Sequence, residues 1–169
     1  MEIINNRRSI RAYSDKAITK DEIMGIIRAS MQAPSARNQQ PWEFLVVTDK
    51  EKLVKCSEEL ANTRMLKGAK AAIIYLTDKR NLITPMMYPQ DLSAAIQNGL
   101  LYATSIKIGT CWCGIYPNEE RMNKVREVFN INKEYLEPFA VVALGYPLNE
   151  GDFRHIDRFD ERKVHFEVL

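Results

Sequence analysis

The stretch Pro34-Ser35-Ala36-Arg37-Asn38-Gln39-Gln40-Pro41-Trp42 lies between an amphipathic segment that ends near Met31 and the apolar run Phe44-Leu45-Val46-Val47. It therefore connects a helix to a strand. A proline restrains each end of the loop, because its ring locks φ and limits the residue before it. The side chains between the prolines are mostly hydroxyl and amide groups, which donate and accept hydrogen bonds. Such a stiff loop suits recognition of a planar ligand rich in heteroatoms, although an ordinary polar loop has the same composition.

Capping signals and apolar periodicity predict the elements on both sides of this loop. Thr19 and Glu22 have capping-box spacing, as do Thr48 and Glu51, so a helix should begin at each pair. A third helix over 91–107 is apolar on more than one side, which indicates burial within the domain or between two subunits. The other predicted elements are helices over 2–6 and from Asn118 onward, and strands over 44–47, 71–76, 110–114 and 139–145.

Three further segments carry expectations of their own. Residues 62–67 predict a polar connection into the strand over 71–76. Residues 78–90 contain two prolines and no clear period, so we expect a loop that acts as a mobile lid over a site. From residue 151 onward the chain mixes charged and aromatic side chains, which need another surface to pack on, such as a partner subunit.

The composition is that of one ordinary globular domain. The chain has 169 residues, 46% of them apolar and 27% charged, and a net charge of +2 that recruits neither nucleic acid nor an acidic membrane. The longest apolar runs, at 71–76 and 139–144, are too short to span a bilayer, and the first six residues lack the order of a signal peptide. Three cysteines argue against a disulfide framework and for a reducing compartment, so we expect a cytoplasmic protein.

Two of the cysteines form the pair Cys111-Trp112-Cys113 in a predicted strand. A redox or metal role is one interpretation of this spacing. A structural zinc site needs four ligands, however, and the remaining candidates, Cys56, His155 and His165, are scattered without ligand spacing. We therefore predict small buried hydrophobic residues and no metal site.

The segment Arg7-Arg8-Ser9-Ile10-Arg11 is a local positive cluster in a nearly neutral chain. Guanidinium groups match pairs of phosphate oxygens, and a serine hydroxyl can complete the site. A solvated basic N-terminus has the same sequence. Nucleic-acid binding is less favoured, because no second basic run with interleaved aromatic residues accompanies the cluster.

Most catalytic motifs are missing from the chain. The seven glycines are dispersed, so neither a dinucleotide fingerprint nor a phosphate loop is present, and there is no His-Glu-x-x-His or Gly-x-Ser-x-Gly sequence. Only two histidines occur, both near the C-terminus, which disfavours a nucleophile paired with a histidine base. If the protein is an enzyme, a bound cofactor should supply its chemistry.

Taken together, these motifs resemble the FMN-dependent nitroreductase family. The similarity begins with Arg7-Arg8-Ser9-Ile10-Arg11-Ala12-Tyr13 and the loop Pro34–Trp42. It continues with the helix ending at Gly109, with Leu144-Gly145-Tyr146-Pro147, and with Arg158-Phe159-Asp160 and Val164-His165-Phe166. The resemblance implies an α+β fold with a mixed, mainly antiparallel central sheet flanked by helices. It also implies an intertwined homodimer, in which residues 1–169 form one FMN-binding domain and the tail 151–169 packs on the partner subunit.

The resemblance assigns the arginine cluster to the FMN phosphate. Arg7 and Ser9 match positions that hold the phosphate and the ribityl chain, with Arg8 beside them, and Arg158 matches a basic residue of the same phosphate site. Arg11 matches a basic residue near the pyrimidine end of the flavin, where its charge would raise the reduction potential.

The ring environment is also implied only by the resemblance. Asn62 and Arg64 correspond to an amide and a basic residue near the ring. Cys113, Gly114 and Ile115 would lie under the ring through their backbone. The residues of the loop that the second subunit would contribute are Pro34, Ser35, Asn38 and Gln40.

Two departures from the family concern the substrate and the nicotinamide preference. The chain is shorter than many relatives between Leu76 and Asp91, where others carry extra helices over the substrate. Ile156 stands where some relatives have lysine, so Arg8 or His155 would compensate for the missing charge.

The implied activity is NAD(P)H-dependent reduction of a nitroaromatic or quinone-type acceptor through bound FMN, in a ping-pong cycle with no catalytic side chain. One alternative is a protein that senses or stores FMN without turnover. Another is a relative with a different reductive task, such as dehalogenation or flavin breakdown. The expected partners are a second copy of the chain and the small-molecule acceptor.

Overall fold

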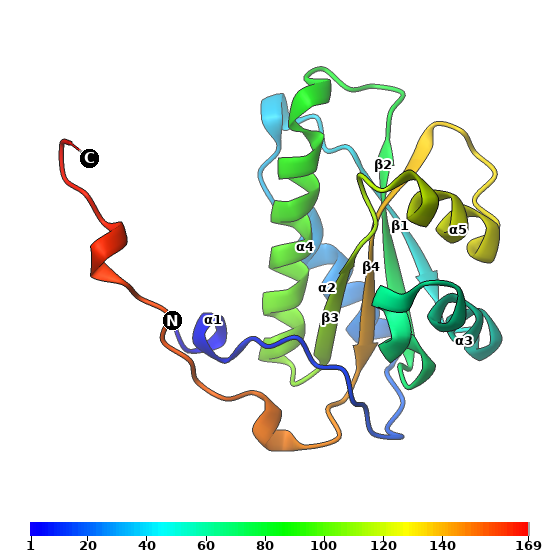
Figure 1. Cartoon of the computed structure of the whole chain (residues 1–169), viewed down its shortest axis with the longest axis horizontal. Helices are drawn as coiled ribbons and strands as arrows, with labels where there is room; N and C mark the ends of the chain where they lie inside the picture. The colour runs from blue at the N-terminus through cyan, green and yellow to red at the C-terminus, as the bar shows by residue number, and fades with distance from the viewer. Residues whose placement is uncertain (169) are drawn as a thin grey trace.

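The computed structural model describes residues 1–168 and contains one four-stranded sheet (Figure 1). The strands lie in the order β1-β2-β4-β3, and each neighbouring pair is antiparallel. Their bounds are β1 Trp42–Val47, β2 Ala71–Asp78, β3 Gly109–Gly114 and β4 Leu136–Gly145. The predicted α+β fold with a mainly antiparallel sheet is confirmed. Among the described residues, the isolated bridge between Ser9 and Thr110 is parallel.

Helices cover both faces of the sheet (Figure 1). On one face α2 and α4 pack against Ile73 and Tyr75 of β2, and on the other α3 and α5 pack against Ile74 and Leu76. β2 is therefore buried on both sides, which explains why its sequence is continuously apolar rather than alternating. The helices are α1 Glu2–Asn6, α2 Lys20–Met31, α3 Lys50–Glu59, α4 Tyr88–Ser105 and α5 Glu119–Phe129.

The first predicted capping box is confirmed, and the second is wrong. The Glu22 N–H donates to the Thr19 hydroxyl at 3.2 Å, and the Thr19 N–H donates to the Glu22 carboxylate at 2.7 Å. At α3 the N-cap is Asp49 rather than Thr48. Its carboxylate accepts from the N–H groups of Glu51 and Lys52, and aspartate is as good an N-cap as threonine.

The predicted loop over 78–90 is shorter in the structure. Asp78 still belongs to β2, and α4 begins at Tyr88, so the connection is 79–87 with a short 3₁₀ turn at Pro85–Met87. Pro89 is part of the first turn of α4, where proline is tolerated because the N–H that it lacks has no helical partner there. Residues 62–67, predicted as a polar connection, belong instead to a 3₁₀ helix over Ala61–Lys67.

The tail leads away from the body of the molecule (Figure 1). Phe159 is 74% exposed and Phe166 is 81% exposed, while the Ile156 N–H donates to the Asn5 carbonyl of α1. Leu169, the last residue of the predicted tail, lies outside the described residues. None of the helices within residues 1–168 is both long and apolar enough to cross a membrane.

Candidate functional site

Residues 7–11, which we call the arginine segment, run beside the start of the edge strand β3. Ser9 bridges Thr110, and the Ile10 N–H donates to the Thr110 carbonyl at 2.8 Å. Main-chain groups alternate between the two edges of an antiparallel strand, so Thr110, Trp112 and Gly114 direct theirs away from β4. Because the Thr110 carbonyl already accepts from Ile10, the part of this edge that is open to a ligand runs from Trp112 to Gly114.

The end of this edge is already tied to neighbouring side chains. The Asn62 amide donates to the Gly114 carbonyl at 2.9 Å, and the Arg121 guanidinium donates to the same carbonyl at 3.3 Å. The Gly114 carbonyl therefore already accepts two hydrogen bonds, while the Gly114 N–H points to the same open side of β3. Ile115 differs from Gly114, because its N–H donates to the Phe139 carbonyl at 3.2 Å and its side chain is fully buried.

Arginine side chains gather around a cavity of ≈640 Å³ next to residues 7–11, which we call the arginine cavity. Its lining includes one carboxylate, Asp152, against five guanidinium groups. The five arginines are Arg7, Arg8, Arg11, Arg154 and Arg158, and Ser9 also lines the cavity. Such an excess of like charge favours binding of an anion.

Arg8 lies among several like charges in this cluster. Burial and the nearby charges of Arg158, Arg7 and Arg154 lower the pKa of its guanidinium. Its Nη2 donates to the Asn5 carbonyl at 2.5 Å, but its Nε is buried without a partner in the described chain. An anion with several oxygens, such as a phosphate, fits this donor set, because guanidinium groups bind such oxygens in pairs.

A second cavity of ≈540 Å³, which we call the edge cavity, extends along the free edge of β3. Arg11 lines both cavities, so the two adjoin at its side chain. The lining of the second cavity includes Asn62, Arg64, Cys113 and Gly114. Together the cavities suit a long ligand with an anionic group at one end and a flat polar ring at the other.

The predicted loop residues lie elsewhere. The loop is bonded to Asp91 in the first turn of α4, whereas α1 and the arginine cluster lie near the opposite end of that helix (Figure 1). Asp91 lies 14 residues before Ser105, the last residue of α4, so these regions are separated by about 21 Å of helix at 1.5 Å per residue. The loop residues absent from the lining of both cavities are Pro34, Ser35, Asn38 and Gln40.

This loop is strained and internally bonded. Arg37, Asn38 and Gln40 have φ of 51°, 54° and 45°, a left-handed conformation that costs about 1 kcal/mol or more for each such residue. The Gln40 N–H donates to the Ser35 hydroxyl at 3.0 Å, and the Gln40 amide donates to the Asn38 side-chain oxygen at 2.8 Å. Strain of this kind is typical of segments that hold a defined shape for binding.

Sequence reasoning missed two basic residues of the site. Arg154 lines the arginine cavity, and its spacing of four residues from Arg158 in the charged tail is the signal that could have found it. Arg121 lines the edge cavity, but no local pattern distinguishes it, because it reaches the Gly114 carbonyl only through the way the chain turns between β3 and α5.

The cysteine pair is buried, as predicted. Cys111 and Cys113 are nearly inaccessible, and the Cys113 Sγ lies 3.4 Å from the Met65 Sδ. A hydrogen bond from Cys113 lowers the pKa of Cys111 to about 7, while that bond and burial raise the pKa of Cys113. Among residues 1–168, no three histidine, cysteine or acidic side chains are grouped as a metal ion would require.

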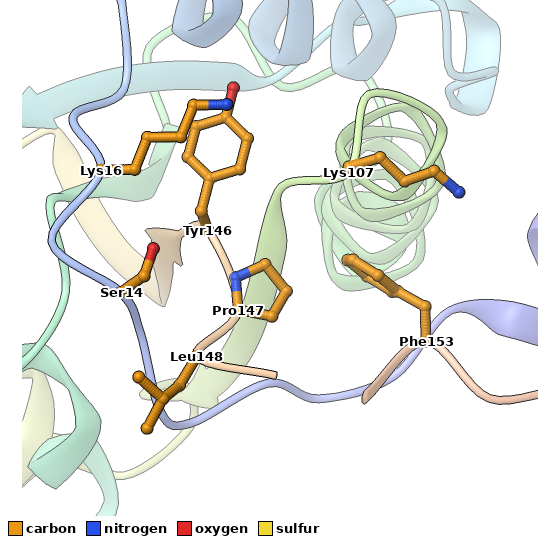
Figure 2. A pocket seen from close by; sticks show the side chains of 7 residues that line it. All are labelled: Ser14, Lys16, Lys107, Tyr146, Pro147, Leu148 and Phe153. Atoms are coloured by element: carbon orange, nitrogen blue, oxygen red, sulfur yellow. The ribbon is translucent and has the colours of Figure 1, made fainter. Parts of the chain in front are cut away.

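A third cavity, of ≈650 Å³, lies beside Tyr146 (Figure 2). Figure 2 shows Lys16 alongside the Tyr146 ring, and its Nζ lies 3.6 Å from the ring centroid. The Tyr146 hydroxyl donates to the Glu22 carboxylate. These polar groups already have partners, so this cavity is a weaker candidate than the arginine cavity.

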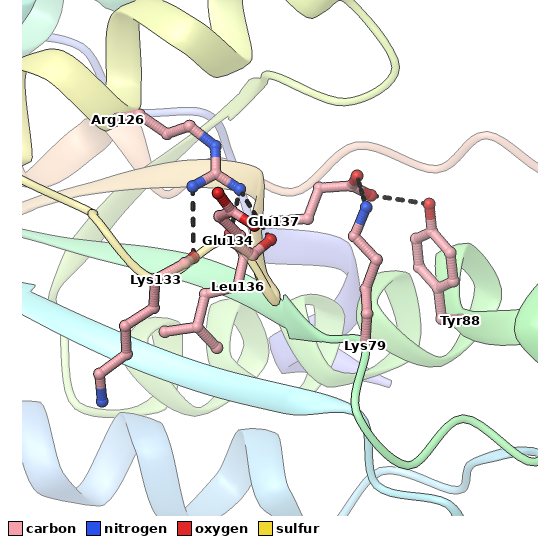
Figure 3. Close-up of polar contacts among 7 residues, drawn as sticks. All are labelled: Lys79, Tyr88, Arg126, Lys133, Glu134, Leu136 and Glu137. Atoms are coloured by element: carbon pink, nitrogen blue, oxygen red, sulfur yellow. Dashed lines mark hydrogen bonds and ion pairs between the residues drawn. The ribbon is translucent and has the colours of Figure 1, made fainter.

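A polar cluster stabilises the start of β4 (Figure 3). The Tyr88 hydroxyl donates to Glu137 at 2.8 Å, and Lys79 forms an ion pair with the same carboxylate. The Arg126 guanidinium donates to the carbonyls of Lys133, Glu134 and Leu136. Burial and hydrogen bonds, including the one to Glu137, raise the pKa of Tyr88, so its hydroxyl stays protonated and can donate to that carboxylate.

Comparisons with known proteins point to one family. A family model described as "Nitroreductase family" matches residues 4–72 and 55–146. A relative from Archaeoglobus fulgidus, provisionally named an NADH dehydrogenase/NAD(P)H nitroreductase, is 46% identical over 99% of this chain and 97% of its own.

Two solved structures share the fold over nearly the whole chain. One, from Clostridium acetobutylicum and provisionally named an NADH oxidase, is 44% identical with a TM-score of 0.94, covering 99% of each chain. The other, a provisional nitroreductase in complex with FMN from Desulfovibrio desulfuricans, is 27% identical with a TM-score of 0.82. The alignment covers 99% of this chain and 96% of that one.

Proposed function

The chain belongs to the nitroreductase family and is an NAD(P)H-dependent oxidoreductase that uses FMN; from this premise we propose a ping-pong cycle that ends on a nitroaromatic or quinone-type acceptor. When bound, FMN accepts a hydride from the reduced nicotinamide and passes the electrons on to the acceptor. The nicotinamide and the acceptor would use the same place on the ring, so the nicotinamide would leave before the acceptor binds. This accounts for the missing dinucleotide fingerprint, because a transient nicotinamide needs no dedicated binding domain.

The arginine cavity is the observation that carries the FMN-binding part of this proposal. The cavity holds five arginines and one carboxylate, and the buried Arg8 Nε has no partner in the described chain. The FMN phosphate is a compact anion that would satisfy both features. Arg7, Ser9 and Arg158 would hold it, with Arg8 and Arg154 beside them.

The edge cavity would hold the flavin ring. The Gly114 N–H, directed to the free edge of β3, would donate to an acceptor atom of the ring. Arg11, which lines both cavities, would favour negative charge on the ring through its own charge. Asn62 and Arg64 would lie near the ring, and Asn62 holds Gly114 in position through its bond to the carbonyl.

The protein's own contribution to the reaction is binding and orientation. Neither cavity is lined by a histidine, so the site has no base of that kind to activate a nucleophile. The edge strand would give the ring a fixed support on one side. This support would place the nicotinamide and then the acceptor against the ring at short range.

A homodimer would complete the site. Pro34, Ser35, Asn38 and Gln40 line neither cavity of their own chain, so we propose that they contact the flavin bound by the partner. The exposed apolar side chains Ile3 and Ile4 of α1 and Phe159 and Phe166 of the tail would be covered in the same assembly. In this proposal the whole chain is one FMN-binding domain whose tail packs on the partner.

A visible absorption spectrum of the purified protein tests this function. We expect a flavin spectrum that bleaches with anaerobic NADH or NADPH and recovers when a nitroaromatic or quinone is added. Flavin that stays oxidised with both nicotinamides would instead indicate FMN storage or sensing. A panel that includes halogenated aromatics and free flavins would reveal another reductive task.

A further inference from the structure

Gln39 joins its own loop to two consecutive segments that lie more than 40 residues later in the sequence. We call residues 34–41 the cofactor loop and residues 79–87 the cover loop. The Gln39 Nε2 donates to the Asp91 carboxylate at 2.6 Å and to the Thr84 carbonyl at 3.3 Å. Its Oε1 accepts from the N–H groups of Ile83 at 3.1 Å and Thr84 at 3.0 Å. One side chain thus bonds the cofactor loop, the cover loop and α4.

Asp91 is the buried anchor of this arrangement. It is 5% exposed, and its second oxygen accepts from the Ala36 N–H at 2.9 Å. Both carboxylate oxygens therefore hold the cofactor loop, one through its backbone and one through Gln39. Hydrogen bonds to a buried charged group are stronger than those between neutral groups, so this contact can maintain a strained loop.

The strain lies on both sides of Gln39. Arg37 and Asn38 before it, and Gln40 after it, have left-handed φ, and none of them is a glycine. A chain free to relax would leave these conformations. The bonds from Asp91 and Gln39 oppose the relaxation, together with the bond from the Asp78 N–H to the Pro41 carbonyl at the end of the loop.

From this geometry we propose that Asp91 and Gln39 are positioning residues that couple FMN binding to ordering of the cover loop. The inference rests on the proposed function, in which the cofactor loop contacts the flavin of the partner subunit. A flavin that selects the bonded form of the cofactor loop also selects the bonded form of the cover loop, because the Gln39 side chain bonds to both loops.

The cover loop would then form one wall of the acceptor site. Ile83 is 58% exposed and Met86 is 88% exposed, so the loop presents apolar side chains to the solvent next to the cofactor loop. These side chains suit a flat, apolar aromatic acceptor lying on the ring. FMN binding would prepare this wall before the acceptor arrives.

Three variants test the coupling. Gln39→Glu keeps the acceptor for Ile83 and Thr84 but sets an oxygen against Asp91. Asp91→Asn keeps the acceptor for Ala36 but brings an amide against the Gln39 amide. In the double variant Q39E/D91N the new amide at position 91 can donate to the new carboxylate at position 39, which restores the bond with donor and acceptor exchanged. Gln32→Glu, the same change at an exposed position at the end of α2, is the control.

FMN affinity and hydrogen exchange are the measurements. We expect each single variant to weaken FMN binding by about tenfold or more. The double variant should recover part of the loss, because it restores the bond to position 91 but not the bond to the Thr84 carbonyl. FMN should slow exchange in residues 79–87 of the wild-type protein and of Gln32→Glu, but not in the single variants. Melting temperatures without FMN measure any general loss of stability.

The outcomes separate this inference from the proposed function. Wild-type affinity and protection in both single variants would overturn the inference, as would FMN binding that never protects 79–87 in the wild-type protein. A double variant that is no better than the single ones would also contradict it. If one single variant does not fold, the other and the double variant decide. A wild-type protein that binds no FMN would refute the function itself.

Discussion

The Ile10 N–H donates to the Thr110 carbonyl at 2.8 Å, and this bond joins the arginine segment to the edge strand that bounds the second cavity. The two cavities adjoin because Ile10 lies between the phosphate-binding candidates and Arg11. The spacing between the anionic and the planar part of a ligand is therefore set by how closely this segment approaches β3.

Gly109 permits that approach, and replacing it should separate the two segments. A Cβ at position 109 would lie 2.8 Å from the Ile10 Cβ, closer than two carbon atoms can come. We expect Gly109→Ala to lower the free energy of unfolding by about 1–3 kcal/mol and to weaken FMN binding. Denaturant unfolding and flavin titration measure the two effects.

Gly68→Ala is the matched control, because its nearest neighbour would lie at 3.8 Å, an ordinary contact. Gly109→Ala with wild-type stability and wild-type FMN affinity would show that the segment moves without cost, and that the close approach to β3 does not matter for binding.

Arg7→Ala should weaken FMN binding by about 1.5–3 kcal/mol, because it removes a charged contact to the phosphate. Riboflavin, which has no phosphate, should bind the variant and the wild-type protein equally. Arg28→Ala, at an exposed position of α2, controls for a general change of charge. Unchanged affinity for FMN in Arg7→Ala would refute the phosphate assignment.

Arg11→Ala should lower the reduction potential of bound FMN, since the ring would lose a nearby positive charge that favours its reduced form. For a partly screened charge worth about 1 kcal/mol, the decrease is about 20 mV for a two-electron couple. Potentiometric titration against a reference dye measures it. Arg11→Lys keeps the charge and should keep most of the potential; an equal decrease in both variants would argue against a charge effect.

The bond between Tyr146 and Glu22 should make stability depend on pH. The Tyr146 hydroxyl and the Thr19 N–H lower the pKa of Glu22, and the same Tyr146 bond raises the pKa of Tyr146. The stabilisation requires an ionised Glu22 and a protonated Tyr146. It is therefore present at neutral pH, lost as the pH falls through the lowered Glu22 pKa, and lost again as the pH rises through the raised Tyr146 pKa.

Tyr146→Phe removes this bond while keeping the ring. The free energy of unfolding, measured between acidic and alkaline pH, should differ between variant and wild type near pH 7 and converge at low pH. A difference that stays constant down to low pH would mean that packing, and not the bond to Glu22, is responsible.

The sequence predicted the elements whose signals are local. The Thr19 capping box and the apolar runs of β2 and β4 could be predicted, because each signal is contained in a short stretch of consecutive residues. Prediction failed where two local solutions compete. Asp49 displaced Thr48 as the cap of α3, and Pro89 entered a helix whose first turn tolerates it.

The candidate site divides in the same way. The arginine segment and the cofactor loop were evident as chemistry, because their donor groups are consecutive in the chain. Tertiary structure decided where these groups lie: Asn62 reaches the Gly114 carbonyl across 52 residues, and Gln39 reaches Asp91 across the same number. Such contacts depend on how helices pack on the sheet, which no local pattern encodes. The sequence thus determined which groups bind, and the packing determined that one chain keeps the loop and the arginine cavity at opposite ends of α4.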